Sequence, residues 1–477
     1  DGADGYTIEP ATKEQVGTDI TLTLMPDSDG DQYSEFLEPY RIQELVKKYS
    51  DYIRYPIQME MPRSRKKEGS DPDKPEWEEY MELTTLNSMI PLWRKSKSEL
   101  KDEDYNQFYK QKFFDYQDPI HHIHMYTEGA VTYHALLYIP SHAPMNYYTK
   151  DYEKGLALYS NGVLIMDKCP DLLPDYFSFV RGLVDSADLS LNISRELLQH
   201  DRHLKLIENA LEKKIKNELA SMMKNKREDY EKFFQAFGLQ LKYGAYMDYG
   251  MHKELLQDLL LYHTAGSESM MSLSEYTEHM KDGQKYIYYA CGETKAKIEL
   301  LPQMERLRDQ GYDVLCLTDS IDEFCMKMMH DYQGKEFKSI SDDNLDLESQ
   351  DEKEEIETLT KEYQPILDQM KQALGDKVTA VQFTSRLKSH PCCLTTKGIV
   401  SLEMEKVLNQ QPGQDKVHAE RILELNAEHP IFQKIKTAEP EKLKKYAQVL
   451  YAQAQLIEGL PIDDPVAYAN TVCDLLA

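Results

Sequence analysis

Long apolar runs and cysteines are both scarce in this sequence. No apolar stretch approaches the ~18 residues that a helix needs to cross a bilayer, so we expect no membrane partner. The seven cysteines are odd in number and form no CxxC motif. This usage argues against a disulfide framework and is typical of a reducing compartment. We therefore expect a cytoplasmic protein.

Positive charge is also in short supply. Basic residues number 56 against 83 acidic residues, which gives a formal net charge of −27. Affinity for nucleic acid comes mainly from Lys and Arg neutralising phosphates, so we expect no nucleic-acid partner. The one short basic run, Arg63–Lys67, continues directly into Glu68 and an acidic stretch, and we interpret it as a solvated loop. Glycine-rich phosphate loops of the GxGxxG or GxxxxGK[ST] type are missing as well.

The residues that are present predict a globular α/β (α+β) protein of several domains. The 477 residues suffice for about three domains, and 41% hydrophobic residues argue against disorder. Period-two patterns predict strands at Ile20–Leu24, Ile53–Glu60, Ala130–Pro140, Leu156–Ile165, Lys285–Ala290, Val314–Leu317, Val378–Phe383 and Arg421–Leu425. Helical spacing predicts helices over 42–49, 102–113, 175–183, 202–237 and 294–309, an acidic helix after 341–359, and two helices at the C-terminus. Asn161-Gly162 is either a hairpin turn or a bulge in one long strand.

One polar segment carries a candidate phosphate contact. Residues 184–194 are predicted to form a loop that enters a helix at about Ser194. Arg195 and Gln199 are four residues apart and therefore share one face of that helix. An arginine beside a helix N-terminus can hold a phosphate, although structural salt bridges are the commoner role of such residues.

The same segment, Val184–Gln199, resembles the catalytic-loop signature of the ninety-kilodalton heat-shock chaperones, and the bacterial branch of that family is the most similar. The resemblance extends along the chain, at Pro91–Trp93, Tyr105–Lys110, Asp175–Asp188 and Leu317–Glu323. Gly17–Leu22 is similar to the end of the family's N-terminal ATPase domain.

The resemblance implies a domain plan. Residues 1–27 would be the C-terminal strands of the ATP-binding domain, and 28–38 a linker. The middle domain would span 39–338, as a large αβα unit (39–200), a helical connector (201–238) and a small αβα unit (239–338). A small α/β dimerisation domain ending in helices would occupy 339–477.

The resemblance also implies an ATP-driven cycle. In the full-length protein ATP and Mg²⁺ would bind to the N-terminal domain, and Arg195 would reach the γ-phosphate with Gln199 beside it. The family's ATP-cradling helices and catalytic Glu have no counterpart in this sequence. We therefore expect an ATPase parent and a chain that alone binds no cofactor and is inactive. The implied partners are unfolded client proteins, the chain's own N-terminal ATPase domain, a second copy in a homodimer and, as candidates, other chaperones of the stress response.

A client surface is the second implied feature. Val400, Met404, Val407 and Leu408 lie on one face of a predicted helix. Spacing alone favours burial in a core, whereas the resemblance implies an exposed and adaptable face. The resemblance further implies client contacts at Trp93, Met145, Glu323 and Phe324.

The C-terminal helices predict a dimer interface. The first helix, about 441–458, has an apolar stripe that includes Leu443, Leu450 and Ile457, and the second has one that includes Val466, Val472 and Leu476. Two short helices cannot cover both stripes with each other, so a four-helix bundle with a second copy is expected. The alternative is that both stripes pack on the domain's own sheet.

Two further questions concern metals and alternative functions. His121, His122 and His124 cluster, but no nearby Cys or paired His at helical spacing supports a metal site, and we expect none. The leading function is a chaperone. The alternatives are the transducer half of another split ATPase, of the topoisomerase or mismatch-repair type, and a passive dimeric scaffold without ATP coupling. The net charge opposes the DNA-linked alternative.

Overall fold

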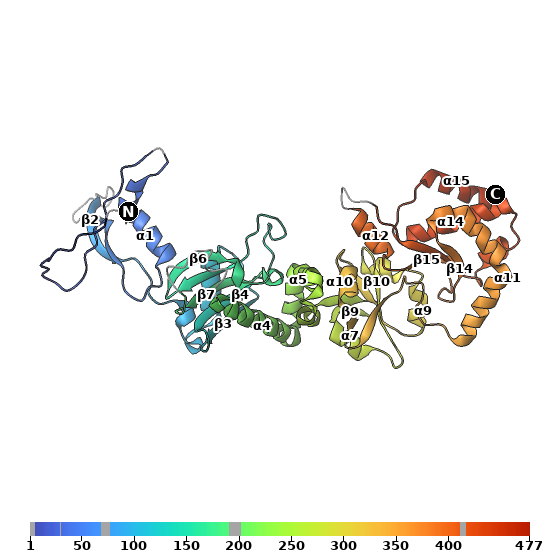
Figure 1. Cartoon of the computed structure of the whole chain (residues 1–477), viewed down its shortest axis with the longest axis horizontal. Coiled ribbons are helices and arrows are strands. Elements are labelled where there is room, and N and C mark those ends of the chain that lie inside the picture. Colours follow the sequence, from blue (N-terminus) through green and yellow to red (C-terminus); the bar gives the residue numbers. More distant parts are fainter. Residues whose placement is uncertain (1–4, 29, 68–76, 190–201, 411–415) are drawn as a thin grey trace.

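The computed structural model describes residues 5–28, 30–67, 77–189, 202–410 and 416–477. Figure 1 shows an elongated molecule in which α/β lobes follow one another from the N-terminal end to the C-terminal end. The described residues form four sheets, of two, five, six and three strands. This mixture of helices and sheets in several lobes confirms the predicted α/β (α+β) fold class. None of the helices in the described ranges is both long and apolar enough to cross a membrane.

The first lobe contains helix α1 (Pro39–Tyr49) and a hairpin of β1 (Gln58–Lys66) and β2 (Trp77–Thr85). The strand predicted at Ile20–Leu24 is not formed, since residues 5–28 contain no strand in this structure and nearly all of them are exposed. The basic run is also not the predicted loop. Arg63 and Arg65 lie in β1 and pair with Glu82 and Glu78 across the hairpin.

The second lobe is built on a five-stranded sheet in the order β3-β4-β7-β5-β6. Its strands are β3 (His121–Thr127), β4 (Tyr133–Ile139), β5 (Leu156–Ser160), β6 (Val163–Cys169) and β7 (Arg181–Ser186), and helix α2 (Asp102–Phe113) accompanies them. Asn161 and Gly162, with φ of 51° and 81°, form the turn of the β5–β6 hairpin, which confirms that alternative.

The helix predicted over 175–183 is wrong. A single 3-10 turn (Asp175–Phe177) precedes β7, which lies between β4 and β5 in the middle of the sheet. Gly182 indicates the reason, since a Cβ there would lie 2.3 Å from the Leu136 carbonyl oxygen of the neighbouring strand. The local apolar pattern suited either structure, and pairing with two strands distant in sequence decided the outcome.

Two long helices, α4 (Arg202–Asn225) and α5 (Arg227–Gly250), connect the second lobe to the third. Leu204, Ile207, Leu211 and Ile215 are buried on one face of α4, as their spacing predicted. One continuous hydrophobic cluster includes these helices and strands of both sheets, so the helices and the two lobes share a core.

The third lobe has a six-stranded sheet in the order β12-β13-β10-β11-β8-β9. Its elements are α6 (Lys253–Leu256), β8 (Leu261–Thr264), β9 (Ser267–Ser272), α7 (Leu273–His279), β10 (Ile287–Cys291), α8 (Lys295–Glu299), α9 (Met304–Asp309), β11 (Leu315–Leu317), α10 (Asp322–Met329), β12 (Asp331–Tyr332) and β13 (Lys335–Ser339). The single helix predicted over 294–309 is two short helices, because Pro302 interrupts the hydrogen-bond ladder between them.

The C-terminal lobe surrounds a three-stranded sheet in the order β14-β16-β15. Its elements are α11 (Gln350–Leu374), β14 (Ala380–Phe383), β15 (Cys392–Lys397), α12 (Leu402–Asn409), β16 (Glu420–Leu425), α13 (Pro430–Ile435), α14 (Pro440–Ile457) and α15 (Pro465–Leu476). The acidic stretch leads into α11, as predicted. Leu367, Leu423 and Leu443 belong to a core of this lobe that is separate from the core of the preceding lobes.

Candidate functional site

The candidate catalytic pair, Arg195 and Gln199, lies outside the described residues. The structure does describe the strand that leads to it. Asp185, at 1% exposure, accepts hydrogen bonds from Trp93 Nε1 and Arg94 Nε, both at 2.9 Å. Further along, Asp188 accepts a hydrogen bond of 2.7 Å from the Thr132 backbone N–H. The base of the predicted catalytic loop is therefore anchored to the sheet.

Trp93, the first candidate client contact, lies in the core of the second lobe. Its side chain is completely buried, and its ring packs 4.5 Å from Tyr52 and 5.3 Å from Tyr159 between ring centroids. A client cannot reach it in this conformation. Trp93 instead fills the core and, through its bond to Asp185, fixes the end of β7.

Met145 lies where a client contact is feasible. Its side chain is fully exposed at the tip of a loop between β4 and β5. Tyr147 anchors that loop, because it is 5% exposed and its hydroxyl hydrogen-bonds with Ser178 Oγ at 2.8 Å. The loop therefore has a fixed base and an apolar tip in solvent.

Glu323 and Phe324 are neighbours in α10 with different surroundings. Glu323 is 2% exposed, and its carboxylate accepts hydrogen bonds from the hydroxyls of Tyr289 and Ser401. Burial raises the pKa of this carboxyl above its ordinary value. Glu323 is therefore not accessible to a client in this conformation, and its client contact stays a prediction. Phe324 is half-buried, and its ring lies 5.9 Å from that of Tyr246.

Ser401 is the functional residue that sequence reasoning missed. It is the N-cap of α12, where its Oγ accepts a hydrogen bond of 3.0 Å from Met404 N–H while it donates to Glu323. A serine directly before an amphipathic helix is a common N-cap signal. Its partner in another lobe, however, could not be read from that signal. This contact places α10, with Phe324, beside α12.

The four apolar residues predicted on one helix face are all half-buried, namely Val400, Met404, Val407 and Leu408, but Val400 precedes α12, which begins at Leu402. The buried positions of this helix are Leu402 and Glu405 instead. Neither full burial nor full exposure is therefore correct for the predicted face. It presents adaptable apolar surface at the junction between the third and C-terminal lobes.

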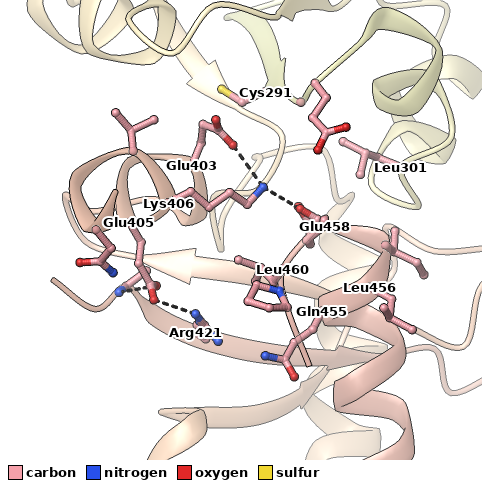
Figure 2. Close-up of a pocket in the computed structure, with 18 of the residues that line it drawn as sticks. Cys291, Leu301, Glu403, Glu405, Lys406, Arg421, Gln455, Leu456, Glu458 and Leu460 are labelled. Carbon is pink, nitrogen blue, oxygen red and sulfur yellow. Dashed lines mark hydrogen bonds and ion pairs between the residues drawn. The ribbon is translucent and has the colours of Figure 1, made fainter. Parts of the chain in front are cut away.

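Beside α12 the junction contains a cavity of about 1420 Å³ (Figure 2). Lys406 Nζ spans it, 3.2 Å from Glu403 Oε2 and 2.7 Å from the Glu458 carbonyl oxygen. The Glu458 carboxylate accepts a hydrogen bond of 2.6 Å from Gln303 Nε2, but burial raises its pKa to about 7. Cys291 and Leu301 belong to the apolar part of the lining.

The predicted dimer residues divide into two groups. Leu443 and Leu450 are each 3% exposed and lie in the core of the C-terminal lobe, so their side chains are not available to a second copy in this structure. The positions of Leu443 and Leu450 agree with the alternative prediction, in which the apolar stripe packs inside the C-terminal lobe. Those with accessible side chains are Ile457 (40% exposed), Val466 (69%), Leu476 (82%) and the half-buried Val472. Their role in a dimer stays a prediction.

The histidine cluster makes contacts with protein groups. His124 hydrogen-bonds with the Tyr105 hydroxyl at 2.8 Å and with the Trp93 carbonyl oxygen at 2.9 Å. His121 pairs with Glu218 at 3.0 Å, and the ring of His122 stacks on Tyr105. Within the described ranges no group of three or more His, Cys, Asp or Glu side chains is arranged to hold a metal ion.

The α/β lobes and the segments that resemble a chaperone family raise the question of which known protein family this sequence matches. The family model described as Hsp90 protein matches residues 70–477, and the chain belongs to this family. It is therefore a molecular chaperone of the heat-shock class.

Comparison with individual proteins agrees with this family assignment. The chain is 52% identical to the Chaperone protein HtpG of Alkaliphilus oremlandii, 54% to that of Clostridium acetobutylicum and 51% to that of Bacillus subtilis. Each match covers 100% of this chain and 76% of the relative.

Proposed function

We propose that this chaperone holds unfolded clients on an apolar surface at the junction of α10 and α12. The observation that carries the proposal is the half-buried row Met404, Val407 and Leu408 on α12, a helix that contacts α10, which carries the half-buried Phe324. Half-buried side chains keep apolar area available to a partner, and methionine adapts to many shapes. Met145 adds a second, fully exposed contact on the β4–β5 loop.

The Glu323–Ser401 hydrogen bond explains how this surface could respond to other parts of the molecule. Both groups are buried, at 2% and 5% exposure, and they join helices that belong to different lobes. Breaking this contact would leave a buried polar group unpaired, which costs ~1–3 kcal/mol. The two helices should therefore move together, and a change in the angle between the lobes would alter the client surface.

For the longer protein, we propose that an N-terminal domain binds ATP with Mg²⁺. Hydrolysis of this ATP would supply the free energy for the conformational cycle. Arg195 would contact the γ-phosphate, with Gln199 beside it. Support comes from the anchored base of that loop at Asp185 and Asp188. Replacing Arg195 with alanine in the longer protein tests it, since turnover should fall strongly while the melting temperature stays unchanged. Turnover within about twofold of the parent would make Arg195 structural.

The proposed assembly is a cytoplasmic homodimer formed by α15 and the exposed end of α14. Support for the dimer comes from Val466 and Leu476, whose apolar side chains lie in solvent. Burying such surface against a second copy is the usual way in which exposed helical stripes are covered. All seven cysteines are free thiols, which supports a reducing cytoplasm.

The client surface is tested by replacing Leu408 with aspartate and titrating a permanently unfolded protein, such as reduced and carboxymethylated α-lactalbumin. We expect client affinity to fall by about tenfold, because a charge on this surface must be desolvated when the client binds. The melting temperature should change little. Tyr116→Asp, at a position that is 97% exposed in another lobe, is the matched control. A large loss of stability with unchanged client affinity would assign this face to the core.

A further inference from the structure

A second, smaller cavity of about 340 Å³ lies beside the loop that carries Met145. Helix α5, strand β8 and the start of α10 form its walls, and Tyr148 of the Met145 loop lies at its edge. Six of its lining residues matter for the argument: Tyr148, Phe234, Lys242, Tyr262, Asp319 and Asp322.

The charges around this cavity do not balance. Lys242, at 4% exposure, places its Nζ 2.7 Å from Asp319 Oδ2 and 2.7 Å from Asp322 Oδ1. No other Lys, Arg, Asp or Glu among the described residues lines the cavity. One ammonium therefore faces two carboxylates, the buried Asp322 and the 45% exposed Asp319, and their combined charge is negative. A second cation that reaches this place would be attracted to it.

The Tyr262 hydroxyl is a second and independent observation. This side chain is 1% exposed and lines the cavity, yet its Oη finds no hydrogen-bond partner among the described residues. Buried hydroxyls are nearly always hydrogen-bonded, so an unpaired one at a cavity points to a missing polar partner. A phenol oxygen can accept a hydrogen bond from the N–H of a cation.

Aromatic rings complete the chemistry of the cavity. Lys242 Nζ lies 5.0 Å from the ring centroid of Tyr262 and 5.8 Å from that of Phe234. The faces of aromatic rings attract cations, most often the guanidinium of arginine. Carboxylates, an aromatic lining and a free hydroxyl together suit a guanidinium or ammonium group, and they do not suit an anion.

The cavity can be reached from solvent. The Asp319 side chain is 45% exposed and Tyr148 is 53% exposed, although Lys242 and Asp322 lie deep. Tyr148 lies at the entrance and belongs to the same loop as the exposed Met145, three residues further along, so one extended segment could place an apolar residue on Met145 and a basic residue in the cavity.

We propose that this cavity binds the side chain of an arginine or lysine of an unfolded client while Met145 contacts an apolar neighbour. The proposal rests on the proposed client binding and specifies which client segments this surface prefers. The net charge of −27 gives the whole molecule a general attraction for basic chains, so the test must separate the cavity from that background.

The test uses two fluorescein-labelled disordered peptides that differ at one residue. Both contain leucine and phenylalanine, and one has a central arginine where the other has citrulline, which has the same shape without the charge. Fluorescence anisotropy measures their affinities for the full chain. We expect the arginine peptide to bind about fivefold more tightly, which is the scale of one partly exposed charge contact.

Two variants assign that preference to the cavity. In Asp319→Asn the ratio of the two affinities should fall to about one while the citrulline peptide binds as before. Asp309→Asn is the matched control, because Asp309 also pairs with one lysine and its side chain is 43% exposed, but it lies elsewhere. That control should keep the parent ratio. Tyr262→Phe should lower the ratio by about twofold without loss of stability, because it removes a hydroxyl that has no partner.

Each outcome has a distinct meaning. Equal affinity of the two peptides for the parent chain would overturn the cavity proposal and leave client binding intact. An equal loss of preference in Asp319→Asn and Asp309→Asn would also overturn it, because general electrostatics would then be the cause. If neither peptide binds to the parent chain, the proposed client surface itself fails. Should Asp319→Asn not fold, the Tyr262→Phe ratio decides, and an unchanged ratio contradicts the proposal.

Discussion

Helices α14 and α15 follow each other in the chain and each carries an apolar stripe, yet the two stripes have different environments. The stripe of α14 lies in the core of the C-terminal lobe, where Leu443 and Leu450 are each 3% exposed. All of α15 is described, and none of its residues is buried. An apolar stripe therefore shows that a helix needs a partner surface, and it does not show whether the same lobe or another molecule provides that surface.

The largest effect is expected where the stripe is buried. Leu450→Ala should lower the free energy of unfolding of the C-terminal lobe by about 2–5 kcal/mol, because it removes packed methyl groups and leaves a cavity. Chemical denaturation followed by circular dichroism measures the change. Val466→Ala, at a position that is 69% exposed, is the control and should stay within about 0.5 kcal/mol of the parent. Equal effects at the two sites would remove the distinction between the helices.

A smaller effect on stability, with a large effect on assembly, is expected for α15. If the proposed dimer forms through α15, the double variant Val466→Asp and Leu476→Lys should be monomeric, because both exposed apolar contacts become charged. An acidic residue near the start of a helix and a basic one near its end suit the helix dipole, so α15 itself should persist. Sedimentation velocity at low micromolar concentration measures the assembly. A double variant that remains dimeric would place the interface elsewhere.

The smallest effect should come from Glu458, the C-cap of α14, whose carboxylate is partly buried against Gln303. Its pKa is raised from 4.5 to about 7, so the folded state binds a proton more tightly than the unfolded state does. The stabilisation that this proton provides is complete below about pH 4.5 and is lost as the pH rises through about 7. The melting temperature of the parent chain should therefore fall relative to that of Glu458→Gln as the pH rises between these values. Parallel curves would contradict the raised pKa.

Much of the fold could be predicted from local patterns. Helix α2 and the buried face of α4 follow their apolar spacing, and the β5–β6 hairpin follows Asn161-Gly162. The failures share a cause. The predictions for 175–183 and Ile20–Leu24 rest on local periodicity, whereas a strand forms only beside a partner strand. Residues 181–186 pair with strands that are distant in sequence, and Ile20–Leu24 pairs with none of the described strands.

The candidate site was predicted less completely. The face of α12, Phe324 and Met145 have accessible apolar surface, as a client contact requires. Trp93 and Glu323 do not, because each found a buried hydrogen-bond partner, Asp185 and Ser401 respectively. A tryptophan or glutamate looks the same in sequence whether its polar atom meets water, a client or another part of its own chain.

The sequence by itself determined the family, the mixture of helices and strands, and the positions of the amphipathic faces, because these depend on residue identity and short-range spacing. Only the tertiary structure decided which faces remain accessible, that α10 and α12 meet through Glu323 and Ser401, and that Lys242 shares a cavity with two carboxylates. Burial and pairing are properties of long-range contacts. The packing of distant segments settles them, and no local pattern records that packing.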